Sequence, residues 1–293
     1  MNKKAVLILA SLLLFISASH PTIGSENPWK DKYEKVGDLK IHYLEAGTGD
    51  RILVFIPGWT MPAEVWREQI PYFSARGFHV IAVDPRSQGK TTKTETGNTY
   101  QQQAADLHAF FHTLDLDPSY LVGWDTGVTM MLDYVSSPET LRPDKIVFVE
   151  GSPAALKSDD YPGEITAQQA RKMLFQFEDD RKKATDRLVR GMFKTTQMEW
   201  MVNDLIKSSM QTPMGAAVSL YFDYFTGDRR PALDYVVFSS LIVTTTGNQA
   251  IGEYMKSKIA GSKLVTIEDA GSAIFLDKPQ AFNQALEEFF GKY

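Results

Sequence analysis

The chain has 293 residues, of which 43% are hydrophobic and 23% are charged. A chain of this length can bury a large core, either as one domain with an insertion or as two domains. Its formal net charge is −5, and the sequence contains no basic cluster, so we expect no nucleic-acid partner. The chain has no cysteine, and its five histidines are scattered. We therefore expect no disulfide, no metal site and no cofactor.

The first residues are typical of a secretory signal peptide. Two lysines near the start precede an apolar run, 5–16, and a group of small residues, 17–19. The apolar run is too short to span a bilayer, which favours cleavage over a stable membrane span. We expect removal of residues 1–19, with cleavage after Gly24 or Ser25 as alternatives, and export to the periplasm or the medium.

Apolar runs bounded by turn residues predict the strands of a sheet, and helical periodicity predicts helices between them. The predicted strands span residues 40–45, 52–56, 79–83, 120–122, 145–150, 240–244 and 263–267, and the predicted helices span 63–76, 100–114, 128–135 and 279–290. Residues 26–34 are polar and aromatic, which indicates a surface lead-in to the fold. Because strand and helix alternate from residue 52 to 150, we predict an α/β fold with a mostly parallel, doubly wound sheet.

The alternation of strand and helix stops between residues 152 and 232. This segment is rich in charged helix formers and in methionine, so we predict a helical cap rather than further sheet. The core then comprises residues 26–151 and 233–293. Methionine side chains adapt to irregular shapes, so the cap is expected either to roof an apolar pocket or to form ordinary packing.

A strand-to-helix elbow is predicted around Asp125. Gly123 and Gly127 flank this residue at the spacing small-x-nucleophile-x-small. In this arrangement the central residue lies in a strained turn, and larger flanking side chains would collide with the neighbouring strand and helix. The central residue of such a turn is most often serine. Asp125 is therefore the first candidate catalytic residue, and its carboxylate changes the chemistry that the elbow can perform.

Several stretches, taken in order, make the chain resemble the α/β-hydrolase family. They are Pro57-Gly58-Trp59, Asp84 to Gly89, Gly123 to Gly127, the predicted cap, and Ala270 to Pro279. The resemblance covers residues 35–293 and includes the esterase-like, non-haem haloperoxidase-like and dehalogenase-like members. It implies an α/β-hydrolase fold with a helical cap insertion, and a site that combines an elbow nucleophile, a histidine and a carboxylate.

The resemblance places the three catalytic positions at Asp125, Asn248 and Ser272. The family's histidine follows the glycine of the last loop, and Gly271 and Pro279 anchor that loop around Ser272. The family's acid position is occupied by the amide of Asn248. A serine hydroxyl does not take up a proton at neutral pH, so the chain is expected to lack ordinary serine-esterase turnover.

Glu150 and two backbone N–H groups complete the predicted site. Some haloalkane dehalogenases and related luciferases of the family place their acid at the strand end where Glu150 stands. Glu150 is then either a supporting acid for Asp125 or a carboxylate packed under the elbow. The N–H groups of Trp59 and Thr126 are expected to form the oxyanion hole. Alternatively, they bind the Asp125 carboxylate itself and lower its pKa.

Four aromatic residues are candidates for the pocket wall. Trp59 and Trp124 either line the pocket or pack beside the elbow. Tyr221 and Tyr224 share one helical face and are similar in placement to the tyrosine pair that activates epoxides in epoxide hydrolases. Tyrosines are also common in caps without that role, so both interpretations remain open.

Three functions remain open from the sequence. The first is an exported, catalytically impaired or non-hydrolytic family member that binds a small apolar ligand. The second is an active hydrolase of esters, lactones, haloalkanes or epoxides, with Asp125 as nucleophile and Glu150 as supporting acid. The third is a lyase or isomerase with Asp125 as general base. The expected partner is a small apolar molecule in each case, and the sequence does not indicate an oligomeric state.

Overall fold

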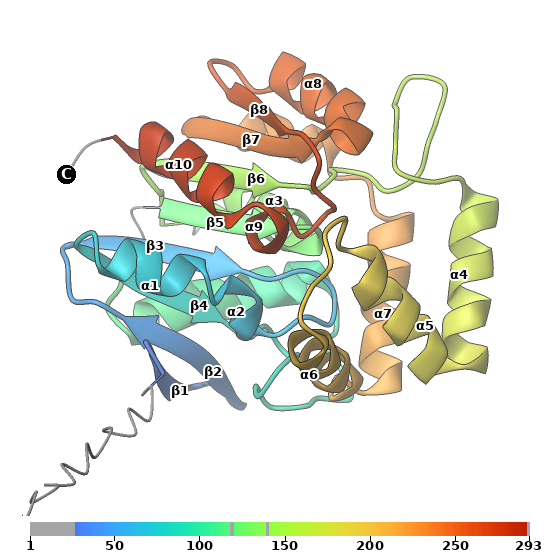
Figure 1. The fold of residues 1–293 in the computed structure, drawn as a ribbon, viewed down its shortest axis with the longest axis horizontal. Helices are drawn as coiled ribbons and strands as arrows, with labels where there is room; N and C mark the ends of the chain where they lie inside the picture. The colour runs from blue at the N-terminus through green and yellow to red at the C-terminus, as the bar shows by residue number, and fades with distance from the viewer. Residues whose placement is uncertain (1–26, 118–119, 139–140, 292–293) are drawn as a thin grey trace, which may run out of the picture.

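A computed structural model describes residues 27–117, 120–138 and 141–291 (Figure 1). The predicted signal peptide and its cleavage points lie outside the described residues. Within the described ranges, no helix is both long enough and apolar enough to cross a membrane.

The described residues form one eight-stranded sheet in the order β1-β2-β4-β3-β5-β6-β7-β8. The strands are β1 Lys30–Val36, β2 Leu39–Ala46, β3 Arg51–Ile56, β4 Phe78–Val83, β5 Tyr120–Trp124, β6 Lys145–Val149, β7 Ser239–Thr245 and β8 Lys263–Ile267. β2 is antiparallel to both of its neighbours, and the remaining neighbours pair in parallel. The predicted fold class, a mostly parallel sheet with helices on both faces, is confirmed.

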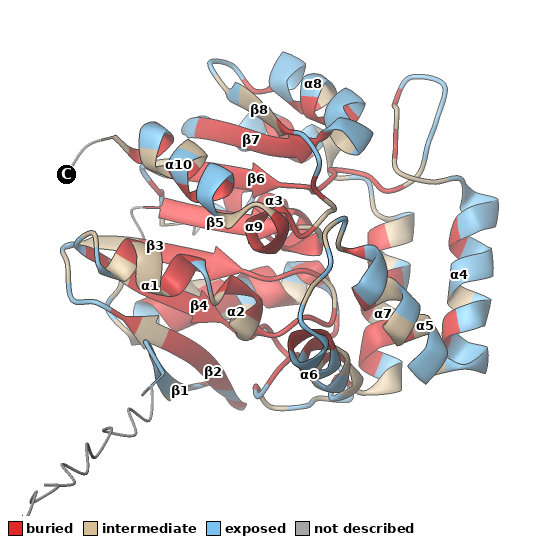
Figure 2. Cartoon of the chain, in the orientation of Figure 1, coloured by how far each residue is buried: buried red, intermediate tan, exposed pale blue. Residues whose placement is uncertain are grey.

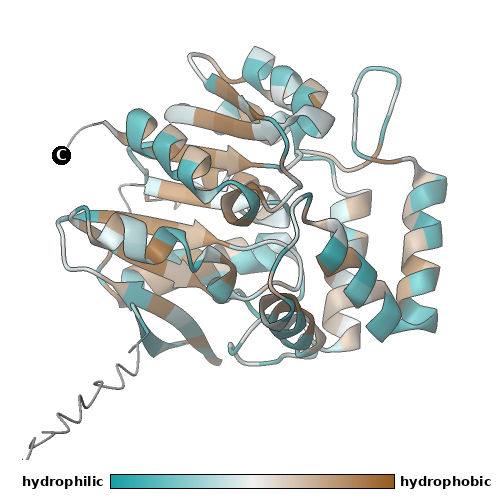
Figure 3. Ribbon diagram, viewed as in Figure 1, coloured by the Kyte–Doolittle hydropathy of each residue, from teal (hydrophilic) through white to brown (hydrophobic). Residues whose placement is uncertain are grey.

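Helices cover both faces of this sheet. One face packs against α1 Gln69–Ser74, α9 Ile274–Asp277 and α10 Pro279–Phe290, and the other packs against α2 Tyr100–Thr113, α3 Thr126–Val135 and α8 Gln249–Lys258. Side chains along β3 alternate between the two cores: Leu53 and Phe55 enter the first, and Val54 and Ile56 enter the second. The central strands are therefore buried and apolar on both faces (Figures 2 and 3), as their unbroken apolar runs predict.

Two of the predicted boundaries are wrong. Residues 26–34 are not only a lead-in, because Lys30–Val36 forms the antiparallel edge strand β1. Most side chains of this edge strand face solvent, so its sequence carries little apolar alternation. The helix predicted over 63–76 is divided into a short 3₁₀ helix, η1 Ala63–Trp66, and α1. Pro71 lacks an N–H group and is tolerated only in the first turn of a helix, which requires α1 to begin afresh near residue 69.

A helical insertion separates β6 from β7. Its helices are α4 Ala167–Asp179, α5 Arg181–Gly191, α6 Glu199–Met210 and α7 Met214–Thr226, followed by the 3₁₀ helix η2 Arg230–Tyr235. They lie together on the side toward which the parallel strands point (Figure 1). Loops at the carboxyl ends of parallel strands commonly carry the ligand site in such folds, so the insertion stands directly over the predicted site.

Arg229 fastens the insertion to the core. Its Nη2 atom donates to Asp133 of α3 and to Asp223 of α7, each at 3.0 Å. Asp223 in turn accepts a hydrogen bond of 2.8 Å from the N–H of Tyr100, the first residue of α2. Because these groups are largely buried, the bidentate contacts of Arg229 fix α7 against α2 and α3.

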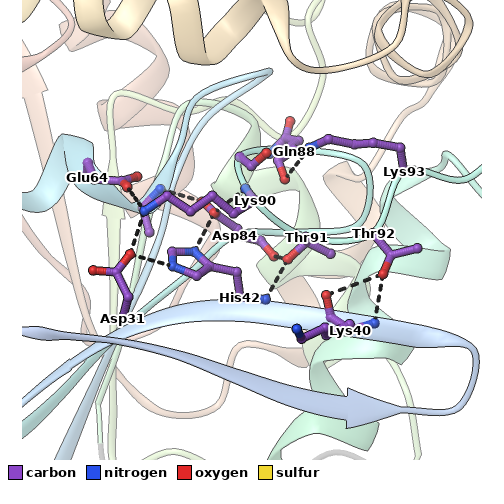
Figure 4. A network of polar contacts seen from close by, with 12 residues as sticks. Asp31, Lys40, His42, Glu64, Asp84, Gln88, Lys90, Thr91, Thr92 and Lys93 are labelled. Carbon is purple, nitrogen blue, oxygen red and sulfur yellow. Dashed lines mark hydrogen bonds and ion pairs between the residues drawn. The ribbon is translucent and has the colours of Figure 1, made fainter.

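A polar network centred on His42 fixes the loop after β4 and the start of η1 (Figure 4). The buried His42 ring joins Asp84 through Nδ1, at 2.7 Å, and Asp31 through Nε2, at 3.0 Å. Asp84 also accepts from the N–H groups of Ala63, at 2.6 Å, and Lys90, at 2.7 Å. Burial alone lowers the pKa of His42, but the hydrogen bonds and charges of the two carboxylates outweigh it and raise this pKa above 6.5.

We expect His42→Gln to lower the free energy of unfolding by about 2–4 kcal/mol, because glutamine cannot carry the charge that pairs with two carboxylates. The folded-state pKa of His42 is raised, so its stabilisation is complete below pH 6.5 and is lost as the pH rises through the folded value. The effect of the substitution, measured by urea unfolding, should therefore be larger at pH 6 than at pH 9.

His79→Gln is the matched control, because His79 also contacts a carboxylate, Glu45, at 2.9 Å but retains 21% exposure of its side chain. Its effect should stay below about 1 kcal/mol. Equal losses of stability for the two variants would contradict a special role for His42.

Candidate functional site

The backbone at Asp125 adopts the strained turn that the glycine spacing predicts. Asp125 stands between β5 and α3 with φ 53° and ψ −121°. A Cβ atom at Gly123 would lie 2.5 Å from Met131 Sδ, and a Cβ atom at Gly127 would lie 2.8 Å from the carbonyl oxygen of Ile56. Larger residues at these two positions would therefore collide with α3 and with the end of β3. The tight packing holds Asp125 in a conformation that is costly for a residue other than glycine.

The Asp125 carboxylate lies at the two backbone groups predicted to form an oxyanion hole. The N–H of Trp59 donates to Asp125 Oδ2 at 3.1 Å, and the N–H of Thr126 is near enough to the same carboxylate to lower its pKa. Burial nevertheless raises the pKa of Asp125 and outweighs both donors. The two donors lower the pKa as expected, but the loss of hydration is the larger effect, so the net pKa of Asp125 is raised and not depressed as that alternative predicts.

Gln88 fixes the loop that carries the Trp59 N–H group. Its side-chain oxygen accepts from the N–H of Thr60 at 2.7 Å, and its side-chain amide donates to the carbonyl of Gly58 at 3.4 Å. Gln88 belongs to the Asp84 to Gly89 loop, which the His42 network holds in place. The sequence reasoning singled out this loop but not Gln88.

Glu150 and Asn248 are in direct contact. Glu150 follows β6 with φ 46°, and its two oxygens accept from the N–H of Thr245 and from Nδ2 of Asn248, the latter at 2.9 Å. Burial raises the pKa of Glu150, and the nearby charge of Asp125 raises it further against the effect of these donors. Asn248, in the 3₁₀ helix η3 Thr246–Asn248 after β7, thus supplies a hydrogen-bond donor where the sequence predicts the position of the family's acid.

Ser272 lies beside the elbow, in the loop after β8. Its carbonyl oxygen accepts from Trp124 Nε1 at 2.9 Å, and Ser272 lines the same pocket as Asp125. The carboxylate of Asp277 fixes this loop: it accepts from the N–H of Gly271 at 2.7 Å and from the N–H of Lys194 at 2.8 Å. The anchored loop therefore brings a hydroxyl, not an imidazole, to the pocket.

The main pocket has a volume of about 360 Å³ and lies between the elbow and the insertion. Its core-side wall is Trp59, Trp124, Asp125 and Ser272, and its insertion-side wall includes Met173, Phe177, Leu188, Met192 and Tyr221. Apart from Asp125, Ser272, Gln176 and Arg187, these walls are mainly aromatic or aliphatic. Such a wall suits a small apolar molecule with few polar groups.

The two predicted pocket tyrosines do not act as a matched pair. The Tyr221 hydroxyl donates to the carbonyl of Ala170 at 2.9 Å, while its ring packs 5.4 Å from the ring of Trp59. The Tyr224 hydroxyl donates instead to Glu164 at 2.5 Å. Neither hydroxyl is left free to activate an epoxide oxygen in this arrangement, so the structure does not favour that interpretation.

A smaller cavity of about 140 Å³ adjoins the main pocket and also includes Asp125 in its wall. Its wall also includes the polar side chains of Glu164, Tyr100, Thr126, Tyr221 and Tyr224. Burial raises the pKa of Glu164 to about 8, and the charge of Asp125 adds to this rise. The sequence reasoning missed Glu164, because a single glutamate in a polar segment carries no motif.

The described histidines lie away from this site. Besides His42 and His79, His108 and His112 contact each other on α2, with ring centroids 4.6 Å apart, and none of these residues lines either cavity. His20 falls outside the described ranges. Within those ranges no group of three or more His, Asp or Glu side chains is placed to hold a metal ion.

Comparison with known proteins identifies the family. The family model "Alpha/beta hydrolase family" matches residues 53–285, so the chain belongs to the α/β-hydrolase family. It is 24% identical over 248 residues to the AB hydrolase superfamily protein YisY of Bacillus subtilis, covering 82% of this chain and 91% of that protein.

Two solved structures show the same fold. A bromoperoxidase from Bacillus anthracis superimposes with a TM-score of 0.83 at 23% identity, covering 89% of this chain and 99% of that chain. An esterase from Exiguobacterium antarcticum gives a TM-score of 0.82 at 22% identity, covering 88% and 98%. At these identities the likeness concerns the fold, and function depends on the site itself.

We expect Asp125→Asn to stabilise the protein at neutral pH. The raised pKa means that the folded state favours the protonated carboxyl, so Asp125 reduces stability once the pH exceeds 3.8, its ordinary value. The melting temperature at pH 7 should rise by about 2–4 °C, the size expected for about 1 kcal/mol in a chain of this length.

The gain should shrink as the pH falls through 3.8 and disappear well below it, where Asp125 is protonated in both states. Asp159→Asn, an exposed substitution, serves as the control and should leave the melting temperature unchanged. A lower melting temperature for Asp125→Asn at pH 7 would show that the N–H donors affect the pKa of Asp125 more strongly than burial does, and would contradict the prediction.

Proposed function

We propose that this chain is a non-hydrolytic member of the α/β-hydrolase family that binds a small, mainly apolar molecule beside Asp125. The observation that carries this proposal is the hydrogen bond of 3.1 Å from the Trp59 N–H to the Asp125 carboxylate. A serine hydrolase keeps this donor for the oxyanion of its tetrahedral intermediate. Here the side chain at the elbow occupies it.

The chemistry at Ser272 supports the same conclusion. Acyl transfer at an elbow needs a base that takes the nucleophile's proton and later activates water. A serine hydroxyl supplies neither function at neutral pH. The apolar walls and the volume of the main pocket remain suited to binding, so loss of turnover does not imply loss of a ligand.

The alternative of an Asp125 nucleophile requires a group that activates water for hydrolysis of the covalent ester. Glu150 is the candidate, but both of its oxygens already accept hydrogen bonds, from the Thr245 N–H and from Asn248. These donors lower the basicity of the carboxylate and fix it toward Thr245 and Asn248, whereas a water-activating carboxylate must face the intermediate. The arrangement around Glu150 therefore favours a structural role under the elbow.

A second candidate function has one observation in its favour. Burial raises the pKa of Asp125, which brings a carboxylate closer to the basicity needed to remove a proton from carbon. Asp125 would then act as the general base of a lyase or isomerase, without a covalent adduct and without a histidine. Exchange of a ligand's acidic C–H for deuterium in D₂O, lost in Asp125→Asn, would distinguish this function from binding alone.

Restoring a catalytic triad provides the decisive test. The substitutions Asp125→Ser and Ser272→His rebuild the nucleophile and the base. Asn248→Asp would set two carboxylates against each other, because Asn248 donates to Glu150, so it should be combined with Glu150→Gln. We expect this fourfold variant to hydrolyse p-nitrophenyl acetate at least about 10-fold faster than the parent, since the fold retains the family's loops.

The matched control is the same variant without Ser272→His, which should stay as inactive as the parent. The parent should show neither turnover nor a mass increase on Asp125. Ester turnover by the parent together with a covalent adduct on Asp125 would refute the proposal and establish a carboxylate-nucleophile hydrolase. An inactive fourfold variant that folds normally would contradict the claim that the rest of the pocket suits a hydrolase site.

We also propose that the protein is exported. The support is the basic, apolar and small-residue sequence of residues 1–19. Expression of the full chain in a bacterium should give a processed protein, and its intact mass should correspond to cleavage after Ser19, with Gly24 or Ser25 as alternatives. Glutamate at positions 3 and 4 should reduce processing, and an unprocessed parent chain in the cytoplasm would contradict export.

A further inference from the structure

The smaller cavity has a polar end that neither proposed role of Asp125 explains. Glu164 lies there on a segment ordered by hydrogen bonds, since its own N–H donates to the carbonyl of Ala155 at 2.8 Å. Tyr224 of α7 donates its hydroxyl to Glu164 Oε1 at 2.5 Å. The backbone of Glu164 is thus fixed by Ala155 and one carboxyl oxygen by Tyr224, in the wall that also contains Asp125.

Tyr100 provides a second polar group at this end, and it lacks a partner. Its side chain is 2% exposed, and its hydroxyl lies near the Thr126 side chain but makes no well-formed hydrogen bond to any of the described residues. A buried hydroxyl without a partner costs about 1–3 kcal/mol. A ligand atom in the cavity that accepts a hydrogen bond would remove this cost.

Burial and two neighbouring carboxyl groups favour the acid form of Glu164. Asp125 and Glu150 repel a further negative charge, and they outweigh the hydroxyl of Tyr224, whose hydrogen bond lowers the pKa of Glu164. The phenol of Tyr161 also faces this carboxyl group, and the resulting pKa of Glu164 is about 8. At neutral pH its carboxyl group is therefore protonated and can donate a hydrogen bond.

We propose that Glu164 and Tyr100 form a donor pair that binds the oxygen of an uncharged carbonyl compound, with the apolar remainder of that ligand in the main pocket. This inference rests on the proposed binding function and adds the chemical class of the ligand. The carbonyl oxygen binds at the insertion side of Asp125, away from the N–H group of Trp59, which the Asp125 carboxylate occupies.

Other ligand classes fit this end of the cavity less well. A carboxylate ligand would be repelled by Asp125 and Glu150, whose charges already disfavour ionisation of Glu164. A hydrocarbon would leave the Tyr100 hydroxyl unsatisfied. An organic cation could bind the aromatic walls, but it would pair with ionised Glu164, so its binding would strengthen with rising pH. Binding of a carbonyl compound should instead weaken as Glu164 loses its proton.

Three probes of similar shape distinguish these classes: acetophenone, ethylbenzene and phenyltrimethylammonium. Binding to the full mature protein can be followed by calorimetry and by the fluorescence of Trp59 and Trp124, which line the main pocket. At pH 6.5 we expect acetophenone to bind at least about 5-fold more tightly than ethylbenzene. Its affinity should fall about 10-fold between pH 6.5 and pH 9.5.

Variants then assign the effect to Glu164 and Tyr100. Glu164→Gln keeps a neutral donor, so it should retain acetophenone binding at pH 6.5 and lose the weakening at pH 9.5. Glu164→Ala and Tyr100→Phe should each weaken binding about 3- to 10-fold at pH 6.5. Glu178→Gln, an exposed substitution on α4, is the control and should change neither affinity nor its pH dependence.

The inference is overturned if acetophenone does not bind at millimolar concentration, if ethylbenzene binds equally well, or if phenyltrimethylammonium binds more tightly than acetophenone at pH 6.5. It is also overturned if Glu164→Gln retains the parent's pH dependence. These results are independent of ester hydrolysis. A parent that forms an ester on Asp125 refutes the proposed function, whereas failure of the probe series in a non-hydrolytic parent refutes the carbonyl site alone.

Discussion

The candidate site depends on one backbone turn, in which Asp125 is held at positive φ between β5 and α3. The flanking glycines leave no room for the turn to relax, so whichever side chain stands at position 125 is directed at the N–H groups of Trp59 and Thr126. A serine side chain ends one bond from Cβ. A carboxylate is one bond longer and reaches these donors. The length of a single side chain thus decides whether the donors are open to a substrate.

The two carboxylate networks of the protein have opposite electrostatic character. Around His42, carboxylates face an imidazole and the ammonium group of Lys90, so charges of both signs stabilise each other. Around the elbow, Asp125, Glu150 and Glu164 are hydrogen-bonded to N–H, amide and hydroxyl groups, and each has a raised pKa. The first network suits a rigid support, and the second suits proton transfer or hydrogen bonding to a neutral ligand.

Much of the fold could be predicted from the sequence, because buried parallel strands produce unbroken apolar runs and the elbow demands small residues at fixed spacing. The loop at Ser272 could also be predicted, because Gly271 and Pro279 mark its position in the sequence. The exposed strand β1 was missed because an edge strand needs little alternation of apolar and polar residues. The helix α8, between Asn248 and β8, was also not predicted.

The hydrogen bonds and pKa shifts of the site could not be predicted from the sequence. Contacts between Glu150 and Asn248, 98 positions apart, and between Glu164 and Tyr224, 60 positions apart, arise from the tertiary arrangement. The direction of the pKa shift of Asp125 depends on the balance between burial and two N–H donors, and a sequence gives no measure of burial at that point. The sequence therefore predicted which residues form the site, but it did not predict their protonation states.

The contacts of Arg229 have a consequence for how fast a ligand can exchange. They fix α7, and with it Tyr221 and Tyr224, to α2 and α3. The remaining wall of the main pocket comes largely from α4 and α5, whose outer faces are exposed (Figure 2). Displacement of these two helices opens the pocket while the clamped side stays in place. The packing of α4 and α5 would then contribute to the residence time of a bound molecule, beside the contacts that the molecule makes in the pocket.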